Sequence, residues 1–146
     1  MNKKLVFLIL SGFTLLGCHF NREFVNREED KATAEKTADI FYENVRQENY
    51  DVVKNLMSKE FYVSTTKDKW EKVLRKTDSL LGKVESRKLV NWQTIRVEGT
   101  DARANYLLQY KVQREKYESA ETITLQKEGD SIKVKYYSVN SDGFAQ

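Results

Sequence analysis

Few side chains in this sequence have types and spacings that could do covalent or metal chemistry. The sole cysteine, Cys18, stands next to the sole histidine, His19, near the N-terminus. The rest of the chain therefore offers no Ser-His or Cys-His pair for nucleophilic catalysis and no Cys/His set for zinc. It also lacks an Asp-x-Asp-x-Asp-Gly loop for calcium. We expect no catalytic residue, no metal and no cofactor, and the single cysteine excludes an intrachain disulfide.

Aromatic residues offer a second kind of site. Five of them combine a large apolar ring with a polar atom, so together they could line a ligand pocket: Trp70, Trp92, Tyr106, Tyr110 and Tyr136. The alternative is that these rings fill the core, where large aromatic side chains are usually found. Both interpretations stay open at the level of sequence.

Acid or base chemistry has two candidates, Tyr110 and Glu121, and either would need a buried position and a perturbed pKa. A cluster of basic residues between positions 67 and 76 could meet anionic lipid headgroups. Acidic residues are interleaved there, however, and Glu71 and Arg75 are four residues apart, which favours a solvated, salt-bridged helix face. The basic residues are Lys67, Lys69, Lys72, Arg75 and Lys76.

The charge pattern excludes one class of partner. The formal net charge is +3, and basic and acidic residues alternate along most of the chain instead of forming blocks. Nucleic-acid binding needs a basic patch that neutralises several phosphates. We therefore expect no nucleic-acid partner.

The N-terminus has the order of an export signal. Lys3 and Lys4 form a positive start, residues 5–16 are apolar, and the small residue Gly17 precedes Cys18. As a helix, the apolar run would measure about 18 Å, well short of the roughly 30 Å hydrocarbon core of a bilayer. We expect residues 1–17 to be a cleaved signal peptide.

The residues Leu15-Leu16-Gly17-Cys18 resemble the processing site of bacterial lipoproteins, although the position of Leu16 more often holds Ala, Ser or Thr. The resemblance implies cleavage between Gly17 and Cys18, diacylation of the Cys18 sulfur with fatty acids such as palmitate, and often a further acyl chain on the new amine. Two chains hold a protein stably on a membrane. The alternative is an ordinary leader, or an uncleaved anchor, with an incidental cysteine.

The same resemblance implies a place in the cell envelope, with membrane lipid as a partner through acylated Cys18. His19 is not the Asp that favours inner-membrane retention in enterobacterial lipoproteins. We therefore expect the periplasmic side of the outer membrane if the host has two membranes. Residues 18–30 are interpreted as the lipidated cysteine and a polar tether, residues 31–140 as a single domain, and residues 141–146 as a C-terminal tail.

Within the domain, helices come first. Apolar residues recur at spacings of three and four from residue 34 to residue 45, which indicates an amphipathic helix. Asp51 suits the N-cap of a second, shorter helix. Thr65-Thr66 opens a third helix that carries Trp70, and Gly82 is suited to end it with a positive φ.

After Gly82 the apolar period changes to two, which indicates strands at residues 86–98, 102–116, 120–127 and 131–139. Short turns with glycine at Gly99 and Gly129 favour antiparallel hairpins. Tyr106 and Tyr110 alternate with polar residues, and so does Tyr136, so each strand has one buried face. The pattern predicts an α+β fold in which N-terminal helices cover one face of a curved, four-stranded antiparallel meander.

Several local strings resemble the nuclear transport factor two-like (cystatin-like) superfamily, and within it a group of short bacterial domains of unknown function. They include an aromatic first helix (38–45), Gln47-Glu48-Asn49-Tyr50, Phe61, Trp70 and Leu81-Gly82-Lys83-Val84-x-x-Arg87. The resemblance covers about residues 31–140. It implies a cone-shaped sheet whose open end can hold a small ligand, catalyse a reaction or dock a partner.

From these observations we expect a membrane-anchored envelope lipoprotein that acts as a non-catalytic binding or protein-interaction module. Its partner would be an envelope protein or a second copy, because a polar outer strand face is available for a homodimer: Asn105, Gln109, Lys111 and Gln113. The alternative is a small-molecule-binding protein or degenerate enzyme that uses the cone. The identity of the ligand or partner lies beyond the sequence.

Overall fold

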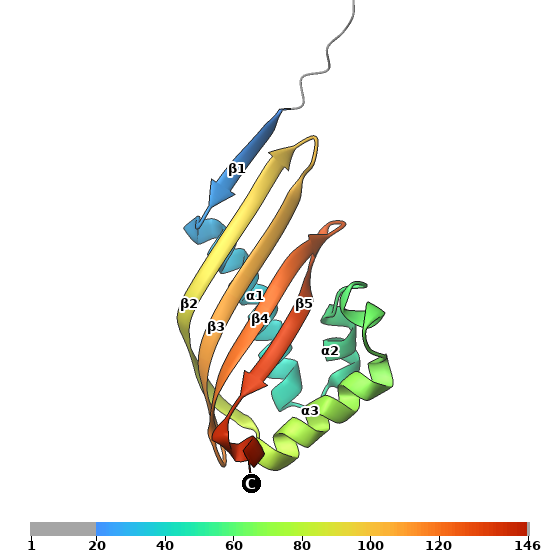
Figure 1. Cartoon of the computed structure of the whole chain (residues 1–146), viewed down its shortest axis with the longest axis vertical. Coiled ribbons are helices and arrows are strands. Elements are labelled where there is room, and N and C mark those ends of the chain that lie inside the picture. Colours follow the sequence, from blue (N-terminus) through green and yellow to red (C-terminus); the bar gives the residue numbers. More distant parts are fainter. Residues whose placement is uncertain (1–19, 146) are drawn as a thin grey trace, which may run out of the picture.

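The computed structural model describes residues 20–145 (Figure 1). In chain order, its elements are β1 (Asn21–Val25), α1 (Glu28–Arg46), α2 (Tyr50–Leu56), the 3₁₀ turn η1 (Phe61–Val63), α3 (Lys67–Leu81), β2 (Val84–Gly99), β3 (Arg103–Arg114), β4 (Glu118–Glu128), β5 (Ser131–Asn140) and the 3₁₀ turn η2 (Asp142–Ala145). Three helices pack against an antiparallel sheet with the order β1-β2-β3-β4-β5. The sheet is not closed, because β1 and β5 are its two edges. The predicted α+β class is confirmed.

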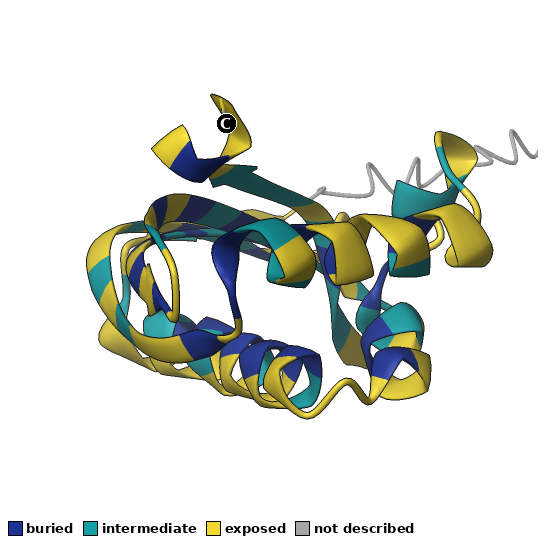
Figure 2. Cartoon of the chain, turned by 90° about the horizontal axis from the view of Figure 1, so that it is seen from below, coloured by how far each residue is buried: buried dark blue, intermediate teal, exposed yellow. Residues whose placement is uncertain are grey.

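The core lies between one face of the sheet and α1. The helix buries a stripe that includes Ala38, Phe41 and Val45, and β3 buries every second residue, as Leu108 and Val112 illustrate. Figure 2 shows the buried residues of the sheet and of α1 facing each other across the domain. Each apolar side chain removed from water in this way stabilises the fold by about 1.5–3 kcal/mol before entropy is counted.

The four strands predicted from the period-two pattern are present as β2 to β5, and consecutive strands pair antiparallel as the glycine turns indicated. The predicted helices are present too, although α2 begins at Tyr50 with Asn49 at the N-cap position that was predicted for Asp51. Thr66 caps α3, where its hydroxyl accepts a hydrogen bond from the Lys69 backbone N–H at 3.3 Å. Gly82 follows the helix with a φ of +82°.

The predicted count of four strands is wrong, because the sheet formed by residues 20–145 has five. The additional strand, β1, lies in the segment that we expected to be a tether, and it pairs with β2 from Asn21 opposite Gly99 to Val25 opposite Ile95. An edge strand can remain polar on both faces, since its backbone hydrogen bonds hold it in place. No alternation of apolar residues therefore marked it in the sequence, and Phe24 is its one partly buried residue.

Two earlier expectations fall on residues that the structure does not describe. The predicted cleavage between Gly17 and Cys18 and the lipidation of Cys18 both lie outside residues 20–145. Within residues 20–145, no helix has the length and apolar character needed to cross a bilayer. The predicted tail contributes η2, whose Gly143 is buried against Leu81 and Tyr117.

Candidate functional site

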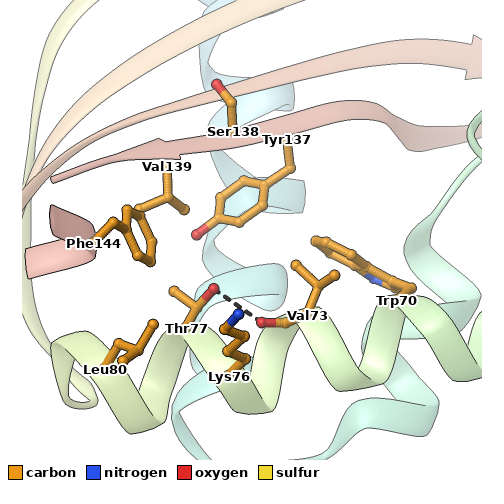
Figure 3. A pocket seen from close by; sticks show the side chains of 9 residues that line it. All are labelled: Trp70, Val73, Lys76, Thr77, Leu80, Tyr137, Ser138, Val139 and Phe144. Atoms are coloured by element: carbon orange, nitrogen blue, oxygen red, sulfur yellow. Dashed lines mark hydrogen bonds between the residues drawn. The ribbon is translucent and has the colours of Figure 1, made fainter. Parts of the chain in front are cut away.

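A groove separates α3 from the edge strand β5. Its larger part is a pocket of about 430 Å³, within the range of about 300–1,000 Å³ that small-ligand pockets occupy. Figure 3 shows Tyr137 and Val139 pointing from β5 toward α3, while Trp70 and Val73 point back from the helix. The full lining is Trp70, Val73, Lys76, Thr77, Leu80, Tyr137, Ser138, Val139 and Phe144.

The groove continues toward the N-terminal end of α3. A second pocket of about 350 Å³ shares Trp70, Val73 and Tyr137 with the first and extends to Phe61 and Lys135. The helix and the strand therefore run side by side in the same direction, as Figure 1 also shows. We call the two pockets together the α3–β5 groove. It is mostly apolar, with the Lys76 ammonium group and the Thr77 hydroxyl at its helix side.

The helix side of the groove follows from how α3 is amphipathic. Trp70, Leu74 and Leu81 are buried, whereas Val73 is about half exposed, at 51%. The Thr77 hydroxyl donates a hydrogen bond to the Val73 carbonyl at 2.9 Å, which satisfies the hydroxyl inside the helix. The apolar side chains of α3 therefore face β5, and the Thr77 hydroxyl beside them already has a hydrogen-bond partner.

The strand side depends on a β-bulge in β5. Val134 lies opposite Leu125 and Tyr136 lies opposite Thr124, so Lys135 is an extra residue without its own partner on β4. One inserted residue reverses which side chains face the core. As a result Tyr137 and Val139 face the helix, whereas Tyr136 is about half exposed and borders only the second pocket.

A buried ionic network lies behind Tyr137. Arg114 and Glu121 have side chains that are 1% and 0% exposed, and the Arg114 Nε donates to Glu121 Oε1 at 2.9 Å. Arg114 Nη1 also donates to Asp78 Oδ1 at 3.0 Å and to the Gly82 carbonyl at 3.2 Å. The network joins the sheet to the C-terminal end of α3, so it fixes one end of the groove.

Glu121 is fully engaged within this network. Its Oε1 also accepts a hydrogen bond from the Ser119 hydroxyl at 2.7 Å, and its Oε2 accepts one from the Tyr137 hydroxyl at 2.5 Å. Arg114 Nη2 donates to the same Tyr137 hydroxyl at 3.3 Å. The phenol of Tyr137 is therefore held in place from behind, while one face of its ring lines the groove.

Comparison with known sequences gives one match. The family described as "Protein of unknown function (DUF4019)" matches residues 33–137. The chain belongs to this family. No curated protein matches the sequence, and no solved structure matches it either.

The range shared with the DUF4019 family runs from α1 to Tyr137. It includes all of α3, the buried Arg114–Glu121 pair and the first part of β5. Phe144 and η2, which close one end of the groove, lie beyond it, as does β1. The main walls of the groove are therefore family elements, and the C-terminal closure lies outside the match.

Burial sets the protonation states in the DUF4019 domain. It raises the pKa of the Tyr137 hydroxyl well above its ordinary value, and the negative charge of Glu121 raises it further. Burial also raises the pKa of Asp78, although the charge of Arg114 opposes the shift. Burial lowers the pKa of Arg114, but the combined effects of Glu121, Tyr137 and Asp78 exceed that of burial, so the pKa is raised. Tyr137 therefore stays neutral near pH 7, and its hydroxyl donates a hydrogen bond to Glu121.

The five aromatic residues predicted to line one pocket do not all meet. Trp70 lines both parts of the groove, and Tyr136 borders only the second part. Tyr106 and Tyr110 are buried in the core of the sheet. Trp92 is partly buried elsewhere on β2, where the Lys31 ammonium lies 5.2 Å from its ring centroid. Tyr106 and Tyr110 also border two other pockets, which are separate from the groove.

The expectation that Tyr136 faces inward with Val134 is wrong. Tyr136 is 54% exposed, because the extra residue Lys135 shifts the alternation by one position. Tyr137 takes the inward position that the uninterrupted period-two pattern assigned to its neighbour. Sequence reasoning missed Tyr137 for this reason alone.

The acid–base candidates are both buried. Tyr110 has a pKa raised to about 12, chiefly by burial, so it stays protonated near neutral pH. Glu121 is engaged by Arg114, Ser119 and Tyr137 as described. Arg114 and Asp78 were also missed, although Arg114 continues the inward alternation of β3 and could have been found by extending that pattern.

Among the basic residues of α3, Arg75 is the one that forms ion pairs within the described part of the chain. Arg75 Nη2 lies 2.9 Å from Glu71, and Lys54 of α2 lies 2.8 Å from the same carboxylate. This agrees with a solvated, salt-bridged face. Within residues 20–145, no three His, Cys, Asp or Glu side chains are placed to hold a metal ion together.

Proposed function

We propose that this protein is a lipid-anchored lipoprotein of the bacterial cell envelope whose domain is a non-catalytic binding module, with the α3–β5 groove as its binding site. The observation that carries the proposal is the groove itself, which is an apolar channel beside a sheet edge that is only partly paired. Exposed apolar surfaces of this kind mark sites of interaction in soluble domains. The ordered network behind Tyr137 supports binding by keeping one wall rigid.

The polar groups around the groove support binding in preference to catalysis. Glu121 accepts hydrogen bonds on both oxygens, and Tyr137 uses its proton on Glu121. A general base needs a free lone pair within reach of a substrate proton. These buried groups position the wall of the groove and leave its surface apolar.

The N-terminal residues support the anchor. Cys18 is the residue that lipoprotein processing would acylate, and β1 begins at Asn21. Three residue steps span at most about 10 Å, so an anchored domain would sit close to the bilayer. Figure 1 places the start of β1 at the end of the sheet remote from η2. The Phe144 end of the groove would therefore face away from the membrane, where a partner in the aqueous space can reach it.

We further propose that the domain is of the nuclear transport factor two-like kind. The order of three helices followed by an antiparallel meander, with α1 across one sheet face, supports this assignment. A periplasmic location on the outer membrane would follow in a host with two membranes.

A small molecule is the second candidate ligand, and the pocket of about 430 Å³ favours it. A homodimer through the outer face of the sheet is the third arrangement, since Asn105, Gln109 and Gln113 lie on that face and no helix covers them among the described residues. The homodimer places the contact on other residues than the groove, so crosslinking separates it from the first two arrangements. Native mass spectrometry separates a protein ligand from a small molecule.

The test is site-specific photo-crosslinking in intact cells of the bacterium that makes the protein. A photoreactive residue at Val73 reports on the groove, and one at Val52 of α2 is the matched control, because both are exposed valines on helices, 51% and 42% exposed. We expect a crosslinked partner at Val73 and none at Val52. A residue at Gln109 reports on the sheet face, and a crosslink there alone would contradict the groove assignment.

Two measurements complete the test. Metabolic labelling with a palmitate analogue should mark the wild-type chain and leave a Cys18→Ala variant unmarked. Native mass spectrometry of protein from its own host should show the bare mass if the ligand is a protein. A co-purifying small mass that is lost in Val73→Glu would favour the small-molecule alternative.

A further inference from the structure

The outer edge of β5 is only partly covered. Met57 forms a parallel bridge with Val134, and the Ser58 backbone N–H donates to the Val134 carbonyl at 2.8 Å. The chain then turns away into η1. Beyond this point, the stretch 136–140 has no backbone partner on its outer side within residues 20–145. The edge therefore accepts one bridge and is then open for five residues, a length of about 17 Å.

The open half of β5 lacks the usual protection of a sheet edge. Exposed edges normally carry charged side chains, above all lysine, that discourage further strands. The other edge strand, β1, carries Arg22 and Glu23. On β5, Lys133 and Lys135 lie in or next to the covered half and are engaged with α2 and the turn before η1. The open half is Tyr136-Tyr137-Ser138-Val139-Asn140 and has no charge.

The α3–β5 groove lies directly beside this open edge. In a strand added to β5, every second side chain would point to the same side as Tyr137 and Val139. That side is the apolar pocket lined by Trp70, Val73 and Leu80. The Lys76 ammonium at the pocket has no ion pair or side-chain hydrogen bond in the described part of the chain. An acidic residue on the incoming strand would supply its counter-charge.

We propose that the open half of β5 binds an extended peptide segment of a partner protein as a sixth strand. Two apolar side chains at alternate positions fill the groove, and an acidic residue meets Lys76. The inference rests on the proposed function, and it names the ligand of the same groove. A second copy of this chain fits less well, because α3 lies beyond the β5 edge (Figure 1) and a whole second sheet would meet it.

The experiment selects peptides on the full chain in detergent micelles. A phage-displayed library of unconstrained random decapeptides is passed over the wild-type protein, after depletion on Val73→Glu. We expect enriched peptides with alternating apolar residues and an acidic residue. Synthetic versions should bind at least about tenfold more weakly to Val73→Glu, a change of about 1.4 kcal/mol or more. Lys76→Glu should weaken binding several-fold, and Val52→Glu should leave it unchanged.

Backbone methylation separates strand addition from simple filling of the pocket. A strand at a sheet edge presents alternate N–H groups to its neighbour. N-methylation at alternate residues of the peptide should therefore reduce binding at least about tenfold in one register and leave it nearly unchanged in the other. If N-methylation changed binding equally in both registers, or if no peptides were enriched, the inference would be overturned. A concentration-dependent dimer lost in Val73→Glu would overturn it in favour of self-association.

The two proposals can fail separately. A crosslink at Val73 in cells together with negative peptide selection would refute strand addition and leave the binding module in place. The absence of both the Val73 crosslink and any co-purifying ligand would refute the proposed function, and the inference with it.

Discussion

Replacing Arg114 with methionine tests the buried network that holds one wall of the groove. Methionine keeps much of the side-chain length but donates no hydrogen bond, so Glu121 and Asp78 would lose their shared cation and the Gly82 carbonyl would lose a donor. Removing one partner of a buried ion pair costs about 3–5 kcal/mol. This is a large share of the about 5–15 kcal/mol that stabilises a typical domain. We expect a loss of that size in the free energy of unfolding.

The loss should also depend on pH. Arg114 opposes the upward shift in the pKa of Asp78, so its removal would raise that pKa further. A carboxyl whose pKa is higher in the folded state than in the unfolded state binds its proton more tightly when folded. Stability then increases as the pH falls through the folded pKa toward the unfolded pKa. The variant should lose most at pH 8 and recover in part at pH 5.

The assay is urea unfolding followed by circular dichroism, on the chain from residue 18 with Cys18→Ser. The double variant Arg114→Met/Glu121→Gln is the control, because it removes the charge that the single variant leaves unpaired. We expect the double variant to be more stable than Arg114→Met alone, a clear departure from additivity. A loss below about 1 kcal/mol for Arg114→Met, or additive effects, would refute the ionic network as a stabilising feature.

Three further predictions concern tyrosines and a glycine. The pKa of Tyr110 is raised to about 12, and that of Tyr137 is raised too; both stay protonated in the folded state while the unfolded chain ionises near pH 10. Stability should therefore fall as the pH rises above 10, by up to about 1.4 kcal/mol per pH unit for each tyrosine, and equal stability at pH 9 and pH 11 would contradict this. Tyr137→Ala should lower the free energy of unfolding by about 3–5 kcal/mol, whereas Tyr136→Ala, at an exposed position, should lower it by less than about 1 kcal/mol. The reverse order in urea unfolding would show that the bulge is misplaced. Gly82→Ala should lower the free energy of unfolding by about 1–3 kcal/mol, because φ is +82° and the new Cβ would lie 2.6 Å from the Glu115 Cβ. A variant that unfolds at the same temperature as the wild type would contradict this prediction.

The helices and the four long strands could be predicted from the sequence, because apolar side chains repeat with the period of each element. Phe41 and Val45 on α1 and Leu108 and Val112 on β3 carry that signal because their burial is decided locally. β1 carries no such signal. Its pairing with β2 depends on backbone hydrogen bonds at an edge, which almost any side chain permits.

The site was less accessible to sequence reasoning. Trp70 lines the groove, but the bulge at Lys135 turns Tyr137 inward in place of Tyr136, and a single inserted residue leaves no compositional trace. The contact of Arg114 with Asp78 joins residues 36 positions apart. Such pairing depends on how α3 meets the sheet, which the local pattern does not determine.

Hydrogen exchange measured on the protein in its native membranes tests the central claim most directly. Exchange at each backbone segment is compared with that of the same chain stripped of its partners in detergent. The account predicts added protection confined to α3 (Lys67–Leu81) and β5 (Ser131–Asn140). Equal exchange in both samples, or protection of β3 on the outer sheet face with α3 unchanged, would contradict it.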